Sequence, residues 1–92
     1  MSLAYAIALA EARSCLAALA DAAPDICESS HYERLLIELD GLHPVGPALS
    51  PIHGTKHELL AGLEVAVDQM ISLGDDGLSL ELLLVRAFDF PL

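Results

Sequence analysis

Hydrophobic residues recur at helical spacing in four stretches of the chain, and prolines and glycines separate these stretches. The predicted helices cover about residues 2–22, 31–40, 51–73 and 77–90, and the main part of the third begins at residue 55. Before the third helix, three prolines within residues 42–51 exclude regular structure. The pattern predicts an all-α fold, in which residues 1–92 form a single domain that is a small, mostly antiparallel four-helix bundle.

Capping residues place the predicted helix ends. Ser30 opens a capping box with the glutamate three residues later, and Thr55 opens a second one with the same spacing. Gly41 and Gly74 follow the last apolar residues of the second and third helices, where glycine commonly ends a helix. The acidic pair after Gly74 offers an N-cap for the fourth helix.

The first and last predicted helices carry apolar residues on nearly every side. A chain of 92 residues leaves a large share of its surface in water, so two such helices cannot both be buried within one copy. Exposing them would create larger apolar patches than soluble monomers usually tolerate. We therefore expect a homodimer or higher oligomer, with an interface formed by six large residues of these helices: Leu9, Leu16, Leu19, Leu80, Leu84 and Phe88.

The chain is strongly acidic, since 14 Asp and Glu residues oppose 4 Lys and Arg residues, for a net charge of −10 at pH 7. This charge repels phosphate backbones and anionic lipid headgroups, so we expect neither nucleic acid nor membrane as a partner. It attracts a basic protein, which is the partner that the charge favours. In the alternative interpretation, the charge serves to keep a chain rich in Leu and Ala soluble. The first residues lack the basic region of a signal peptide, and no run approaches the roughly 18 apolar residues of a membrane span, which together predict a cytoplasmic protein.

Histidines are candidate metal ligands in the third helix. If the turn that starts at Pro51 continues into this helix, His53 and His57 lie one turn apart on the same face, which suits two metal ligands. Glu64 lies further along that face, at least roughly 10 Å from His57 along the helix axis. In the alternative interpretation, His57, Glu64 and Asp68 form the solvated face of an amphipathic helix.

Arg13 and Arg86 are the single cations of two otherwise apolar helices. An unpaired buried guanidinium costs several kcal/mol, so we expect ion pairs with a carboxylate such as Glu11, Glu81 or Asp89. In the alternative interpretation, the arginines bind a carboxylate or phosphate ligand inside an apolar pocket, with Tyr5 or Tyr32 as further polar contacts.

Motifs of catalysis and of cofactor binding give no support for an enzyme. No nucleophile motif, glycine-rich phosphate loop or paired-cysteine metal site occurs, and no cofactor is predicted. Cys15 and Cys27 are too few for a disulfide scaffold, and we expect Cys15 to pack as a small hydrophobic residue. The favoured hypothesis is a non-enzymatic protein–protein interaction or regulatory module. The alternative is a small-molecule-binding protein or accessory enzyme, with an apolar pocket between helices and an arginine as the anion anchor.

Overall fold

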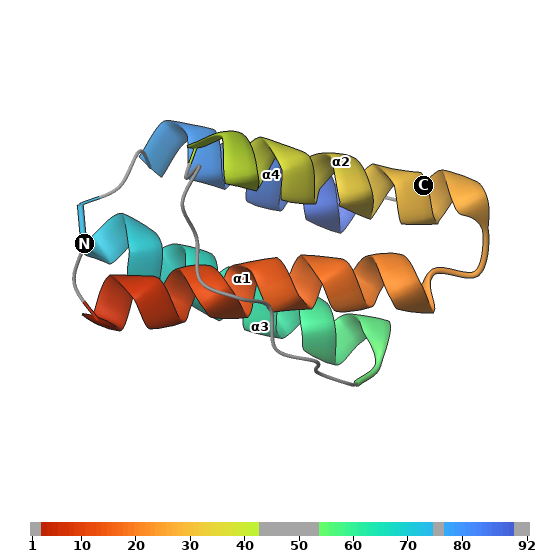
Figure 1. Ribbon diagram of the computed structural model, residues 1–92, viewed down its shortest axis with the longest axis horizontal. Helices are drawn as coiled ribbons and strands as arrows, with labels where there is room; N and C mark the ends of the chain where they lie inside the picture. The colour runs from red at the N-terminus through yellow and green to blue at the C-terminus, as the bar shows by residue number, and fades with distance from the viewer. Residues whose placement is uncertain (1–2, 43–53, 75–76, 90–92) are drawn as a thin grey trace.

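Four α-helices make up the computed structural model, which describes residues 3–42, 54–74 and 77–89 (Figure 1). The helices are α1 (Leu3–Ala22), α2 (Ile26–Leu42), α3 (Lys56–Ser72) and α4 (Gly77–Asp89). No strand occurs within the described ranges. The prediction of an all-α protein with four packed helices is confirmed.

Each helix packs against two of the others. α1 contacts α2 and α3, and α4 contacts the same two helices, so the order around the bundle is α1, α2, α4, α3. Figure 1 shows α1 and α3 in one layer and α2 and α4 in the other. α3 follows α2 in sequence but lies diagonally across the bundle from it.

The core lies between the two layers and consists mainly of leucines from all four helices. Leu9 and Leu16 are fully buried, Leu19 is 2% exposed, and Leu80 is fully buried. These four residues were expected at an interface between copies, and that prediction is wrong because one chain alone buries them. The sequence predicted that α1 is apolar on nearly every side. In the structure Leu9, Leu16 and Leu19 point inward, while Leu3 and Ile7 near the start of the helix are exposed.

Small residues let α1 and α3 approach closely. Ala8, Ala12 and Cys15 are buried on α1, and Ala66 is buried on α3. A Cβ atom at Gly62 would lie 3.2 Å from the Sγ atom of Cys15, which is tighter than an ordinary van der Waals contact. A side chain at this position would therefore require Cys15 or the two helices to shift.

α2 begins five residues before its predicted start. Asp25 is the N-cap, since its Oδ1 atom accepts a hydrogen bond of 2.8 Å from the backbone N–H of Glu28. Ser30 lies inside the helix, so the capping box predicted there is wrong. The helix also continues past Gly41 to Leu42, because glycine weakens a helix without having to end it. α2 is thus 17 residues long.

The ends of α3 follow the local sequence. The capping box at Thr55 is confirmed, with both hydrogen bonds between Thr55 and Glu58 present. Hydrogen bonds to the Glu58 carboxyl, first from the Thr55 backbone N–H and then from the Thr55 side chain, lower the pKa of this carboxyl from its usual value. At the other end Gly74 has a φ of +98°, a conformation that glycine adopts without the steric cost of a Cβ atom. The predicted turn from Pro51 and the predicted cap at residues 75–76 lie outside the described residues.

α1 is long and apolar enough to cross a membrane, judged by length and composition alone. The expectation that no segment approaches a membrane span is therefore wrong for this helix. In the bundle, 44% of the apolar 18-residue stretch of this helix is buried. Core helices of soluble proteins and signal sequences share this length and composition, so the helix does not decide the location of the protein.

Because α1 and α3 are in close contact, a large side chain on α3 should destabilise the protein at residue 62 but not at residue 61. Gly62→Leu places a large side chain against Cys15 and should lower the free energy of unfolding by about 1–3 kcal/mol. Ala61→Leu is the matched control, because residue 61 is exposed on the same helix. Urea unfolding followed by circular dichroism measures both. Equal stability of the two variants would contradict this account of the packing.

Candidate functional site

Arg13 and Arg86 both form ion pairs with carboxylates of α2. Arg13 Nε lies 2.8 Å from Asp40 Oδ1, and Arg86 Nη2 lies 2.7 Å from Glu38 Oε2. The expected ion pairs are therefore present, but these carboxylates come from a neighbouring helix rather than from the helices that carry the arginines. The guanidiniums are bound to protein carboxylates, and none of Arg13, Arg86, Tyr5 and Tyr32 lines the groove that lies between α1 and α3.

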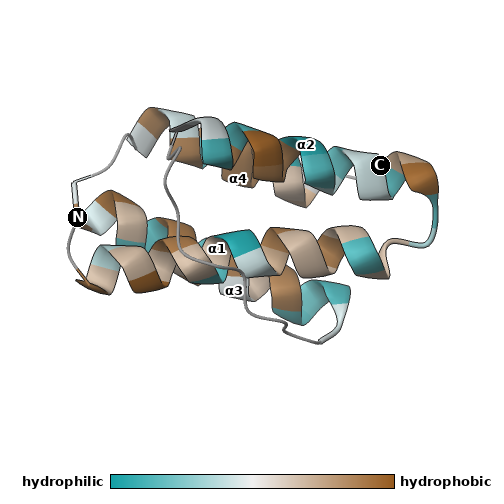
Figure 2. Cartoon of the chain, viewed as in Figure 1, coloured by the Kyte–Doolittle hydropathy of each residue, from teal (hydrophilic) through white to brown (hydrophobic). Residues whose placement is uncertain are grey.

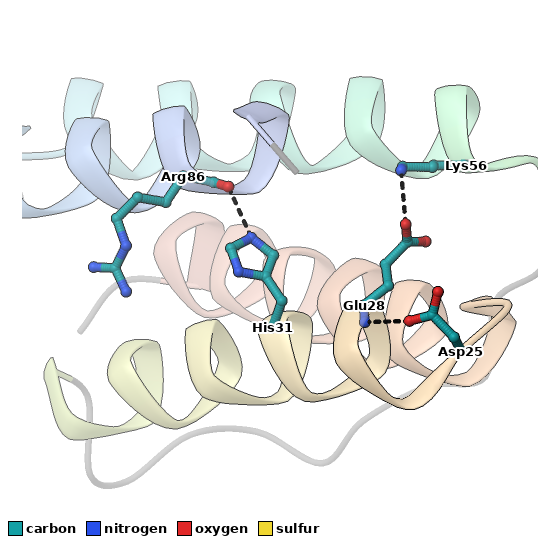
Figure 3. A network of polar contacts seen from close by, with 5 residues as sticks. All are labelled: Asp25, Glu28, His31, Lys56 and Arg86. Carbon is teal, nitrogen blue, oxygen red and sulfur yellow. Dashed lines mark hydrogen bonds and ion pairs between the residues drawn. The ribbon is translucent and has the colours of Figure 1, made fainter. Parts of the chain in front are cut away.

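A largely buried ion pair connects the first turns of α2 and α3 (Figure 3). Glu28 is 5% exposed, and its Oε1 atom lies 3.3 Å from the Nζ atom of Lys56. The Lys56 side chain is 40% exposed, so one end of the pair remains in contact with water. A buried carboxylate needs such a partner, because leaving it unpaired costs several kcal/mol.

Tyr32 lies close to this ion pair and is fully buried. Its hydroxyl makes no hydrogen bond within the described part of the chain. Burial raises the pKa of the Tyr32 hydroxyl, and the nearby Lys56 ammonium opposes that rise. Tyr32 was a candidate ligand contact, but the structure places it in the core, where a ligand at the surface does not reach it.

His31 connects α2 to the last turn of α4. Its Nε2 atom lies 2.8 Å from the carbonyl oxygen of Arg86, as Figure 3 shows. A carbonyl oxygen only accepts hydrogen bonds, so the proton lies on Nε2 and His31 is the donor. Carbonyls in the last turn of a helix lack partners within the helix, and His31 supplies one from outside.

The metal prediction rested on His53 and His57. His57 is exposed in the first turn of α3, and His53 lies outside the described residues. Within the described ranges, no three His, Cys, Asp or Glu side chains are grouped so that they could hold a metal ion. Tyr5, the remaining candidate ligand contact, is half-buried on α1 and packs against the core.

An open groove lies between the N-terminal half of α1 and the C-terminal half of α3 and has a volume of about 560 Å³. Its walls are mainly apolar, and three of the large residues are about half exposed: Ile7 (50%), Val65 (55%) and Leu73 (48%). Asp68 is the charged residue in its lining. The groove was not predicted from the sequence. Val65, an apolar residue beside the polar face predicted for α3, could have indicated it.

The outer face of α4 carries a second set of exposed apolar residues. Leu78 is 71% exposed, Leu82 and Val85 are each 54% exposed, and Phe88 is 46% exposed. Figure 2 shows hydrophobic residues over much of this helix. Of the predicted interface residues, Phe88 belongs to this face, and Leu84 is partly buried against the core. We call these four exposed residues the α4 outer face.

The two cysteines differ in environment. Cys15 is 5% exposed, and burial, with a smaller contribution from the charge of Glu11, raises the pKa of its thiol. The prediction that Cys15 packs as a small hydrophobic residue is confirmed. Cys27 is a free, exposed thiol in the first turn of α2.

No protein-family model, curated protein or solved structure matches this chain. The candidate functional sites therefore come from the structure alone, and they are the groove between α1 and α3 and the α4 outer face.

The ion pair between Glu28 and Lys56 should be costly to break from one side. Lys56→Met leaves the Glu28 carboxylate buried without its cation and should lower the free energy of unfolding by about 1–3 kcal/mol. Adding Glu28→Gln to this variant removes the buried charge and should restore part of the loss. Chemical unfolding of the two single variants and the double variant gives the coupling. Strictly additive losses would show that the pair does not act as a unit.

Thiol reactivity should separate the two cysteines. Cys27 is exposed, and Cys15 is buried with a raised pKa, which leaves little thiolate at neutral pH. With a colorimetric disulfide reagent, we expect one thiol per chain to react quickly and the second to react only after denaturation. Cys27→Ser should eliminate the fast phase. Two fast thiols in the native protein would contradict the burial of Cys15.

Proposed function

We propose that this chain is a small, acidic, non-enzymatic interaction module that associates with a second copy through the α4 outer face and presents its acidic surface to a basic protein. A mostly antiparallel order of the helices and a cytoplasmic location are part of this proposal. The observation that carries it is the exposure of four large apolar side chains along a single short helix.

The α4 outer face has the spacing of a helix-packing surface. Leu78, Leu82 and Val85 are separated by four and three residues, which places them in one row along the helix. At about 1.5 Å per residue, the α4 outer face extends about 15 Å along the helix, from Leu78 to Phe88. Covering these side chains removes apolar surface from water, which favours association at about 25 cal/mol per Å².

A second copy suits this face because its charges are few and largely balanced. Of the described exposed residues of α4, Glu81 and Arg86 are charged, and Arg86 is paired with Glu38 of α2. Two chains of net charge −10 repel each other over most of their surfaces. The repulsion is weakest where apolar side chains and a neutral ion pair dominate, so this face favours self-association.

The acidic surface supports the basic partner. Arg13, Lys56 and Arg86 are three of the four lysines and arginines, and each is in an ion pair with a carboxylate of α2. Most of the 14 acidic residues are not neutralised by these three cations, so the protein keeps a negative electrostatic potential. Opposite charge accelerates association and adds specificity, which is the advantage such a surface offers to a basic protein.

Oligomeric state tests the role of the α4 outer face. The native chain should show a concentration-dependent mass that approaches twice its 9.7 kDa, because one helix face buries less area than a tight obligate dimer. Leu82→Glu places a charge in the middle of the row and should shift the protein to monomer, raising the dissociation constant at least about tenfold. Light scattering after size exclusion, and sedimentation equilibrium, measure the mass.

Ile37→Glu is the matched control, since Ile37 is 69% exposed on α2 and does not belong to the α4 outer face. This variant should associate as the native chain does. A native protein that stays monomeric at high micromolar concentration would refute self-association. An equal effect of both variants would remove the assignment to α4.

A further inference from the structure

We propose that the groove between α1 and α3 binds a basic amphipathic helix of a partner protein. The inference rests on the proposed function, because it names the surface and the chemistry by which the acidic module takes its basic partner. It concerns a different part of the molecule from the α4 outer face, so the two can be tested separately.

The shape of the groove suits a helix. It lies between two packed helices and is open to solvent, with Ala4 and Ile7 on the α1 side and Val65 and Leu73 on the α3 side. An amphipathic helix places apolar side chains at positions i, i+3 or i+4, and i+7, and inserts them into such grooves. The small side chain of Ala4 leaves room between the larger ones. A small molecule would remain largely uncovered in a site this open, whereas tight small-molecule sites bury most of their ligand.

Acidic residues accompany the apolar walls. Asp68 lines the groove, together with the uncharged polar side chains Gln69 and Ser72. Glu64 precedes Asp68 by one turn of α3 and is exposed on the same side. On α1, Glu11 follows Ile7 by one turn and is also exposed. A helix lying along the groove with lysines or arginines beside its apolar row would meet these carboxylates.

The cations of the two groove helices are engaged elsewhere. α1 and α3 each contain one lysine or arginine, Arg13 and Lys56. Arg13 pairs with Asp40 and Lys56 pairs with Glu28, both on α2 and away from the groove lining. The charge beside the groove is therefore negative, which selects a basic occupant and disfavours an acidic one.

Binding to designed peptides tests the proposal. The probe is a dye-labelled synthetic helix with leucines at i, i+3, i+4 and i+7 and lysines at the other positions. Two further peptides serve as references, a scrambled sequence of the same composition and the same pattern with glutamate in place of lysine. Fluorescence anisotropy with the native chain should show binding of the patterned basic peptide, and at least about tenfold weaker binding of the other two.

Variants locate the binding surface. Val65→Ser removes an apolar wall and should weaken binding about tenfold, the loss expected for one buried valine side chain. Asp68→Asn should weaken binding severalfold and reduce its dependence on salt. The matched controls are Ile37→Ser and Glu33→Gln, exposed positions on α2 outside the groove, and both should bind as the native chain does.

Equal losses in the groove and control variants, or equal binding of the scrambled peptide, would reduce the effect to general attraction by the net charge and overturn the proposal. A long-chain alkylamine serves as a competitor. If it binds the groove more tightly than the peptide does, the proposal of a helical occupant is overturned in favour of a small amphipathic cation. If Leu82→Glu abolishes peptide binding and the groove variants do not, the groove proposal fails but the interaction function survives. If no peptide binds and the native chain is a monomer, both fail.

Discussion

The close packing of α1 on α3 is the constraint on which the rest of the bundle depends. Ala8 and Ala12 on α1, and Gly62 and Ala66 on α3, let the two backbones approach, and Cys15 fills the remaining space opposite Gly62. Small residues lie on this side, and Leu9, Leu16 and Leu19 of α1 belong to the core between the layers. The same arrangement creates the groove, because Ala4 continues the small-residue side of α1 to the surface, where larger residues flank it.

α2 holds the other helices in place through charge. Its carboxylates pair with one cation from each of the other helices, Arg13 of α1, Lys56 of α3 and Arg86 of α4. His31 adds a hydrogen bond to the last turn of α4. Exposed ion pairs contribute little to stability, but specific pairs disfavour other arrangements of the helices. This matters in a bundle whose apolar residues alone allow several packings, since α1 and α4 are apolar on more than one side.

Helix ends that are determined by residues close in sequence could be predicted from the sequence. The capping box at Thr55 and the end of α3 before Gly74 involve atoms a few residues apart, and both could be predicted. The start of α2 could not, because Asp25 and Ser30 are both good N-caps and local rules do not rank them. The pair of Arg13 with Asp40 spans 27 residues, so it depends on how the helices are arranged. The hydrophobic pattern identified the large apolar residues of α1. It could not distinguish those that are buried within a single chain from those that remain exposed.

Negative charge distinguishes the groove from the α4 outer face. Beside the groove, Glu11, Glu64 and Asp68 are exposed, and a second copy of the chain would bring more carboxylates against them. The α4 outer face has Glu81 and a neutralised Arg86 instead. Like charges placed together across an interface cost several kcal/mol, which supports the proposal of a second copy at α4 rather than at the groove. In the proposed function, the charge of −10 acts through its distribution, because it favours a second copy at the α4 outer face and a partner of opposite charge at the groove.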